Sequence, residues 1–200
     1  MTTEQIEIRK TKNITLSQIA LGCEPGTLHL NVKSFHGHHS LIDTKISPTI
    51  EKIEVEVDTV DRYCRMKNIE QIDFLKIDVE GFEEEVLKGA KDMLSHGKVR
   101  LVLFEHRAAI LSSVGKHGKD IFTPLLDSGY TVFTLDGRKL TSQELDNPPD
   151  ADFLAAMDPD EFKSLVKETK NAWLSLGKVS YSLTKDEQRH KIFKRSIFVS

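Results

Sequence analysis

The sequence lacks the features that define several large classes of proteins. Its two cysteines, Cys23 and Cys64, lie far apart without metal-binding spacing, which argues against a disulfide scaffold or a structural zinc site and indicates a cytoplasmic protein. No apolar run approaches the roughly 18 residues that would suggest a membrane span, and residues 1–13 carry no signal-peptide core. Lys and Arg number 28 against 31 Asp and Glu, so the charge balance does not favour nucleic-acid binding.

What is present indicates one α/β domain. Hydrophobic residues make up 38% of the 200 positions, enough for a real core. The clearest segment is 73–106, in which an apolar strand, a helix with a hydrophobic stripe and a second apolar strand follow one another. This order is a βαβ crossover, so we expect its two strands to be parallel neighbours in a buried sheet.

The remaining patterns extend this sheet. Residues 14–32 read as a β-hairpin with a turn at Glu24–Thr27, where Gly26 would supply a positive φ, and residues 53–57 alternate as a half-buried strand. A helix is expected to begin at Asp158 and to continue through Trp173 and Leu176. The strands expected in a mainly parallel sheet are Ile14–Leu21, Phe74–Val79, Val99–Phe104 and Tyr130–Leu135, with Phe153–Ala156 as an antiparallel last strand.

Charged residues gather where two of these strands end. Asp78 and Glu80 follow the first strand of the crossover, and Glu105 and His106 end the second. Ligands of open α/β sheets bind beyond the carboxyl ends of the strands, so these side chains could orient a hydroxyl substrate, act as general base or hold a cation. The alternative is structural, because Lys76 shares a strand face with Asp78 and the two could simply form an ion pair.

Three neighbouring features have simpler interpretations. Gly81 is expected to leave room for a ligand against the backbone. The run Glu83, Glu84 and Glu85 is expected to be a solvated helix start, because negative charge is favourable there. The histidines of the loop at positions 36–39 are expected to be solvated, since a metal site needs three or four convergent ligands; we therefore predict no metal.

The sequence around these strands resembles the FkbM-type methyltransferase family. The core of the resemblance is the string K-I-D-V-E-G-x-E at Lys76–Glu83, continued by V-L-K-G-A at Val86–Ala90 and by Phe104-Glu105. Further matches in the same order are Ala20-Leu21-Gly22, Asp58-Thr59-Val60-Asp61, Gly129-Tyr130 and Phe153-Leu154-Ala155. The likeness covers positions 13–157, which we take as the methyltransferase domain, followed by a C-terminal helix and basic tail at 158–200.

The resemblance implies a Rossmann-like, three-layer class I fold and a methyltransferase that depends on S-adenosylmethionine and methylates a hydroxyl oxygen. It implies catalytic roles for Asp78 and Glu80, and cofactor contacts at Ala20, Leu21 and Asp78. The implied contacts to the acceptor are Lys76, Glu105, His106 and His38. No glycine-rich cofactor loop occurs in the sequence, so we expect the first two strands of that fold to be missing and the cofactor to bind weakly or not at all. The missing strands would leave one sheet edge exposed, near Phe74–Val79 or Ile14–Leu21.

Two classes of function stay open. The first is a methyltransferase acting on a small-molecule or glycan hydroxyl. The second is a non-catalytic binding or interaction module derived from the same fold, which the missing glycine loop favours. The retained Asp78, Glu80 and Glu105 disfavour it, because buried charges that serve no chemistry cost stability. An exposed strand edge would also leave room for a homo-oligomer.

Overall fold

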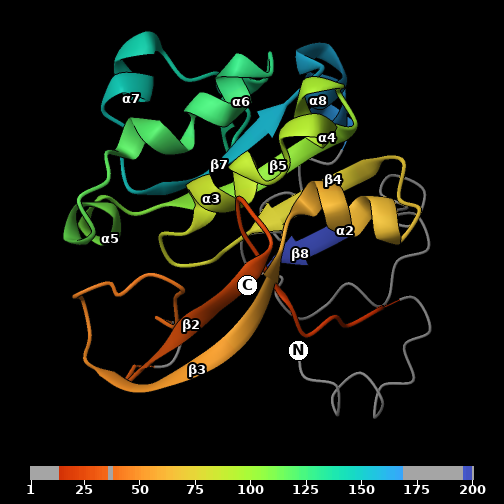
Figure 1. Ribbon diagram of the computed structural model, residues 1–200. Helices are drawn as coiled ribbons and strands as arrows, with labels where there is room; N and C mark the ends of the chain where they lie inside the picture. The colour runs from red at the N-terminus through yellow and green to blue at the C-terminus, as the bar shows by residue number, and fades with distance from the viewer. Residues whose placement is uncertain (1–13, 36–37, 169–195, 200) are drawn as a thin grey trace.

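The computed structural model describes residues 14–35, 38–168 and 196–199, which form two β-sheets, the larger with helices on both of its faces (Figure 1). The larger sheet has the strand order β6 (Thr131–Thr134), β7 (Ala151–Ala156), β5 (Val99–His106), β4 (Ile72–Ile77) and β8 (Ser196–Val199). Trp173 and Leu176, which were predicted to lie on the last helix, are outside the described residues, and so is His36.

The βαβ unit at the centre of this sheet is confirmed. Strands β4 and β5 are parallel neighbours, and Leu75 and Val102 pair in register with both side chains fully buried. The helical segment between them is divided into α3 (Glu83–Lys88) and α4 (Lys91–Ser95), where the sequence predicted one continuous helix. The division has a physical reason, because the carboxylate of Asp61 accepts hydrogen bonds from the backbone N–H groups of Asp92 and Met93 and so starts a new helix.

The sheet is mixed, as the sequence predicted. Strand β7 is antiparallel to both β5 and β6, so β6 runs in the same direction as β5. Among the described strands of this sheet, β7 alone is reversed. The segment between β6 and β7 contains a short helix, α7 (Ser142–Asp146), where only a polar loop was expected. A five-residue helix is far shorter than a crossover helix that returns a chain to a parallel strand, so the antiparallel outcome still holds.

The edge of β4 is paired, so of the two places where an exposed edge was expected, near Phe74–Val79 or near Ile14–Leu21, the first is wrong. Strand β8 runs parallel to β4 from Ser196 to Val199, and the N–H of Asp78 donates to the carbonyl of Val199 at 2.9 Å. Ile197 packs against the main core and the ring of Phe198 meets that of Phe74 edge-on at 6.2 Å. The C-terminal residues, which the sequence left without structure, therefore fill the place beside β4.

The smaller sheet corrects two further expectations. Its order is β1 (Ala20–Leu21), β3 (Thr49–Asp58) and β2 (Gly26–Lys33). Strand β2 pairs with β3, not with residues 14–21, and β1 pairs in parallel with the end of β3. The predicted hairpin at residues 14–32 is therefore wrong, and so is the predicted place of residues 14–21 in the main sheet. Gly26 begins β2 and does not have the positive φ that a turn was expected to require.

The hairpin of β2 and β3 extends away from the larger sheet (Figure 1). Only the end of β3 is buried, at Val57 and Asp58, so the expected half-buried strand is mostly exposed. The loop between the two strands returns to the body of the protein: the hydroxyl of Ser40 donates to the carbonyl of Val79, and Lys33, which is 2% exposed, donates to Asp43, Thr49 and the carbonyl of Thr44. This loop thereby lies against the exit of β4.

The remaining helices follow their local signals. Thr59 caps α2 (Val60–Met66) by accepting from the N–H of Arg62 at 3.0 Å, and the side chain of Asp158 accepts from two N–H groups at the start of α8 (Pro159–Glu168). The other helical segments are α5 (Ala108–Ser113), the 3₁₀ turn η1 (Gly118–Ile121) and α6 (Thr123–Asp127). With ten residues, α8 is the longest helix described, about half of what a bilayer crossing requires, so no helix in these ranges could span a membrane.

Candidate functional site

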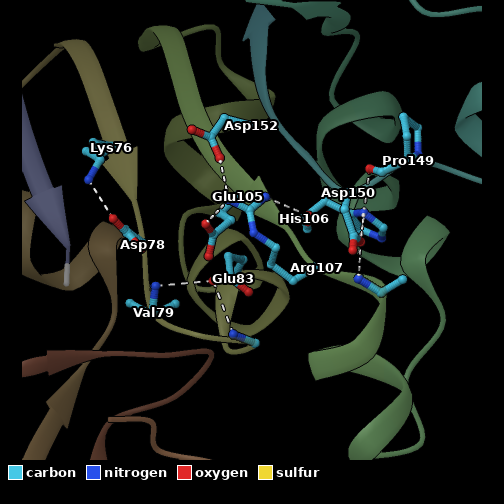
Figure 2. Close-up of polar contacts among 12 residues, drawn as sticks. Lys76, Asp78, Val79, Glu83, Glu105, His106, Arg107, Pro149, Asp150 and Asp152 are labelled. Atoms are coloured by element: carbon cyan, nitrogen blue, oxygen red, sulfur yellow. Dashed lines mark hydrogen bonds and ion pairs between the residues drawn. The ribbon is translucent and has the colours of Figure 1, made fainter. Parts of the chain in front are cut away.

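Lys76 and Asp78 form the ion pair that the structural interpretation anticipated. Lys76 Nζ lies 2.6 Å from Asp78 Oδ2, and the two side chains are 34% and 37% exposed. Both groups therefore stand at the solvent-facing rim of the sheet and not inside it. The ion pair fixes the Asp78 carboxylate at the exit of β4 while leaving part of it accessible (Figure 2).

The turn after β4 holds Glu80 in an unusual backbone conformation. Glu80 has a φ of 53°, which is the left-handed region that non-glycine residues rarely adopt, and Gly81 follows with a φ of 96°. Gly81 was expected to leave room for a ligand, and this expectation is wrong. A Cβ atom built on it would lie 2.6 Å from Ile110 Cγ2 and 3.2 Å from Ile42 Cδ1, so apolar side chains fill that space.

The three glutamates that follow are not a solvated helix start. Glu83 is only 2% exposed, and its Oε1 accepts from the backbone N–H groups of Val79 and Gly81, both at 3.2 Å. Glu84 is ion-paired with Lys88 and Lys116 at 2.7 and 3.1 Å. A helix N-terminus favours negative charge, but this preference does not tell whether a glutamate faces water or binds a partner within the protein.

The exit of β5 brings a second carboxylate, Glu105, which is 19% exposed at its side chain. Its neighbour two residues on, Arg107, contacts Glu105 and also Asp152 on the adjacent strand β7, at 3.3 Å. Asp152 lies directly opposite Glu105 in the antiparallel register. Neither Arg107 nor Asp152 was predicted; Arg107 could have been found from its position two residues after Glu105, but Asp152 depends on strand pairing that no local pattern reveals.

Asp78, Glu80 and Glu105 meet in one cluster, which we call the carboxylate cluster. One oxygen of each lies within 4.8 Å of the others, although they come from two different strands. Burial raises the pKa of Glu105 to about 7, the Arg107 guanidinium opposes this, and the charges of Asp78, Glu80 and Asp152 add to it. Burial also raises the pKa of Glu80, against the influence of the nearby His38.

Of the other predicted acceptor contacts, His38 lies near this cluster and His106 does not. His38, in the loop between β2 and β3, is close enough to influence Glu80, and its ring lies tilted beside that of Phe35, with 5.0 Å between the ring centres. His106 follows Glu105 on the strand and points to the opposite face, because successive side chains alternate. There it is 1% exposed among Phe122 and Phe153, and its Nδ1 lies 2.9 Å from the carbonyl of Pro149 (Figure 2).

Two cavities found among the described residues are not lined by residues of the cluster. One of about 450 Å³ lies between the β2–β3 hairpin and α2, lined among others by Gly26, Glu56 and Arg62. The carboxylate cluster instead opens at the rim of the larger sheet.

A comparison with models of protein families identifies the class. The model described as the methyltransferase FkbM domain matches residues 8–132, more than half of the sequence. The chain belongs to this family, as the string at Lys76–Glu83 predicted. No curated protein and no solved structure matches it. Membership supports methyltransferase activity in general and implies a methyl donor, typically S-adenosylmethionine.

Of the three residues predicted to bind that donor, Leu21 lies in a closely packed segment. Leu21 is 7% exposed and belongs to the hydrophobic core, and the carbonyl of Gly22 lies against Gly89. A Cβ on Gly22 would meet Val57 and Phe82 at 3.1 and 3.2 Å, so protein atoms surround this segment. Of Ala20, Leu21 and Asp78, Asp78 has its functional group at the rim of the sheet.

This packing leads to the first prediction. S-adenosylmethionine titrated into the 200-residue chain is expected to bind with a dissociation constant weaker than about 0.1 mM, a standard binding free energy of less than roughly 5.5 kcal/mol in magnitude. The physical reason is that the sequence has no glycine-rich loop and that protein side chains pack closely around Gly22. Isothermal titration calorimetry measures this directly. Submicromolar affinity would contradict the placement of Ala20 and Leu21 as packing residues.

Proposed function

We propose that this chain acts on a hydroxyl group, as an S-adenosylmethionine-dependent O-methyltransferase with a Rossmann-like class I fold. The observation that carries the proposal is the carboxylate cluster at the carboxyl ends of β4 and β5, in which one oxygen each of Asp78, Glu80 and Glu105 lies within 4.8 Å of the others. Burial in this cluster raises the pKa of Glu105 to about 7. A general base is most effective when its pKa lies near the working pH, because it is then ionised and still basic. Perturbed carboxyl groups at a strand exit are the usual mark of a functional site.

Each residue of the cluster has a separate task in this proposal. Glu105 accepts the proton of the acceptor hydroxyl, and the oxygen becomes nucleophilic as the proton leaves. Asp78, fixed by Lys76, and Glu80 accept hydrogen bonds from the acceptor and orient it, which matters because a displacement at carbon requires alignment of the reacting atoms. Arg107 keeps Glu105 directed at the rim while tempering the rise in its pKa.

The charge of the site selects among acceptors. Asp78, Glu80, Glu105 and Asp152 provide four carboxylates against the two cations Lys76 and Arg107. A neutral polyhydroxylated acceptor, such as a small polyol or a glycan, can donate hydrogen bonds to carboxylates, whereas a phosphorylated one would be repelled. His38 extends the site toward the β2–β3 loop, where it would contact the same acceptor.

The prediction for this site concerns its two β4 carboxylates. Asp78→Asn and Glu80→Gln are each expected to slow methyl transfer at least about tenfold, roughly 1.4 kcal/mol in the barrier, because the acceptor loses a charged hydrogen-bond partner. The assay follows isotope-labelled methyl transfer from millimolar S-adenosylmethionine to a panel of neutral polyols and glycans. Circular dichroism should show that the fold is unchanged, since both substitutions are nearly isosteric.

The matched control is Glu54→Gln, which changes an exposed carboxylate on the β2–β3 hairpin and should leave the rate unchanged. Two variants that turn over like the wild type would show that the carboxylates serve only as partners of Lys76 and its neighbours. Saturable binding of an acceptor that Asp78→Asn abolishes, with no transfer at any donor concentration, would favour the non-catalytic binding module. The test includes that alternative because Leu21 and Gly22, where cofactor contacts were expected, are closely packed against protein atoms.

A further inference from the structure

The buried carboxylate of Glu83 takes no part in the proposed chemistry, and its contacts are unusual. It lies in the first turn of α3, 2% exposed, and its Oε1 accepts hydrogen bonds from the N–H groups of Val79 and Gly81 (Figure 2). These two N–H groups flank Glu80. One oxygen thus connects both sides of the residue whose own carboxylate belongs to the cluster.

We propose that Glu83 is a positioning residue, which holds Glu80 in its left-handed backbone conformation and so aims the Glu80 carboxylate at Asp78 and Glu105. Successive N–H groups converge on one anionic atom when the residue between them is left-handed, and such a concave arrangement is stabilised by the anion it surrounds. The φ of 53° at Glu80 is a conformation that an L-residue does not hold without compensation. The two hydrogen bonds from Val79 and Gly81 provide that compensation.

An explanation by packing alone accounts less well for a carboxyl group at this place. Burial raises the pKa of Glu83, so the surroundings disfavour its charge. An apolar side chain would avoid that cost and would suit the neighbouring core residues Val86 and Leu87. It could not accept from the turn, however, and the two N–H groups would be left without partners in a buried place. What the carboxyl group adds is an acceptor at one defined point.

The geometry makes a consequence at Glu105 measurable without any assay of activity. The groups that face Glu105 are Asp78 and Glu80 from the exit of β4, Asp152 from β7 and Arg107 from its own strand exit. Releasing the turn moves the Glu80 charge away and leaves the other three in place. The titration midpoint of Glu105 should then fall, although burial continues to hold it above the ordinary value of a glutamate.

The experiment compares Glu83→Leu with Glu83→Gln. Gln keeps an oxygen acceptor at the same reach and Leu does not. Carboxyl ¹³C NMR, with the Glu105 signal assigned by its loss in Glu105→Gln, should give a midpoint near 7 in the wild type and in Glu83→Gln, and a midpoint lower by at least about 0.5 pH unit in Glu83→Leu. Glu54→Gln serves again as the control and should leave the midpoint of Glu105 unchanged.

A second readout rests on the proposed function. Methyl transfer should fall at least about tenfold in Glu83→Leu and return in Glu83→Gln. A shifted midpoint with no transfer in any variant, the wild type included, would support the positioning role and overturn the proposed function alone. If Glu83→Leu does not fold, Glu83→Asp is used in its place. Its side chain is one methylene shorter and cannot reach both N–H groups. An unchanged Glu105 midpoint in whichever variant folds, or a Glu83→Gln protein that behaves like Glu83→Leu, would overturn the positioning role.

Discussion

At pH 8 the Glu105→Gln protein is expected to be more stable than the wild type and to transfer methyl groups at least about a hundredfold more slowly, the usual contribution of a general base. The two effects have one cause. Burial and three neighbouring carboxylates raise the pKa of Glu105 from 4.5 to about 7, so its ionised form is costly in the folded state. The same raised pKa makes Glu105 a suitable base.

The pH dependence of this stability has a defined sign. A carboxyl group whose pKa is raised by folding stabilises the folded state below its unfolded pKa, and that contribution is lost as the pH rises through the folded value. For Glu105 the loss occurs between pH 4.5 and about 7 and amounts to about 3 kcal/mol at most, from 1.36 kcal/mol for each pKa unit. Gln does not titrate, so its advantage should approach about 3 kcal/mol at pH 8 and be near zero at pH 4.5.

Urea unfolding at the two pH values measures the stability, and the pH profile of the methyl-transfer rate measures the base. The wild-type rate should rise with a midpoint near pH 7, and this rise should be missing in Glu105→Gln. Glu54→Gln, exposed on the hairpin, should change neither quantity. A Glu105→Gln protein that is less stable than the wild type at both pH values would show that the ion pair with Arg107 outweighs the burial of charge.

Replacing Gly89 with alanine is expected to destabilise the folded protein. Gly89 ends α3 with a φ of −73°, which alanine can adopt, and helix propensity alone would favour the change by about 1 kcal/mol. A Cβ there, however, would lie 1.9 Å from the carbonyl oxygen of Gly22, far inside the contact distance. Because Gly22 is backbone and its N–H is bound to the carbonyl of Asp58, the obstacle cannot rotate away.

Overpacking of this kind costs 1–3 kcal/mol or more, so we expect Gly89→Ala to be destabilised by about 2 kcal/mol after the gain in propensity. For a chain of this size that lowers the melting temperature by roughly 4–8 °C. Gly26→Ala is the matched control, because no atom lies within 4 Å of its added Cβ and its φ is not positive. A Gly89→Ala protein as stable as the wild type would mean that β1 can move away from α3 at little cost.

The local patterns predicted the central part of the fold well because its signals are local. The continuous apolar runs at β4 and β5 and the 3.6-residue stripe between them give strand, helix and strand without knowledge of partners. The partner of β2 was predicted wrongly because Pro25 and Gly26 resemble a turn. The actual partner, β3, lies beyond a loop of some fifteen residues. Residues 14–19 are apolar enough for a strand, but only Ala20 and Leu21 find a neighbour.

The site was predicted in part for the same reason. Asp78, Glu80 and Glu105 could be placed together because parallel strands end at one edge of a sheet. His106 was assigned with Glu105 by proximity in sequence, although strand alternation sends it to the other face. The role of Glu83 was missed because it depends on a left-handed residue in the preceding turn, and nothing in the letters V-E-G-F-E distinguishes a carboxylate that receives two N–H groups from one that faces water.

The pairing of β8 with β4 also imposes an order of events during synthesis of the chain. Ser196 is added 119 positions after Ile77, so at 5–20 residues per second the edge of β4 must wait roughly 6–24 s on the ribosome for its neighbour. During that interval the backbone groups on that side of β4 are unpaired, and an unpaired apolar edge is where nascent chains associate. Slower translation or a depleted chaperone supply should therefore lower the soluble yield of this protein more than that of a domain whose edge strands are synthesised first.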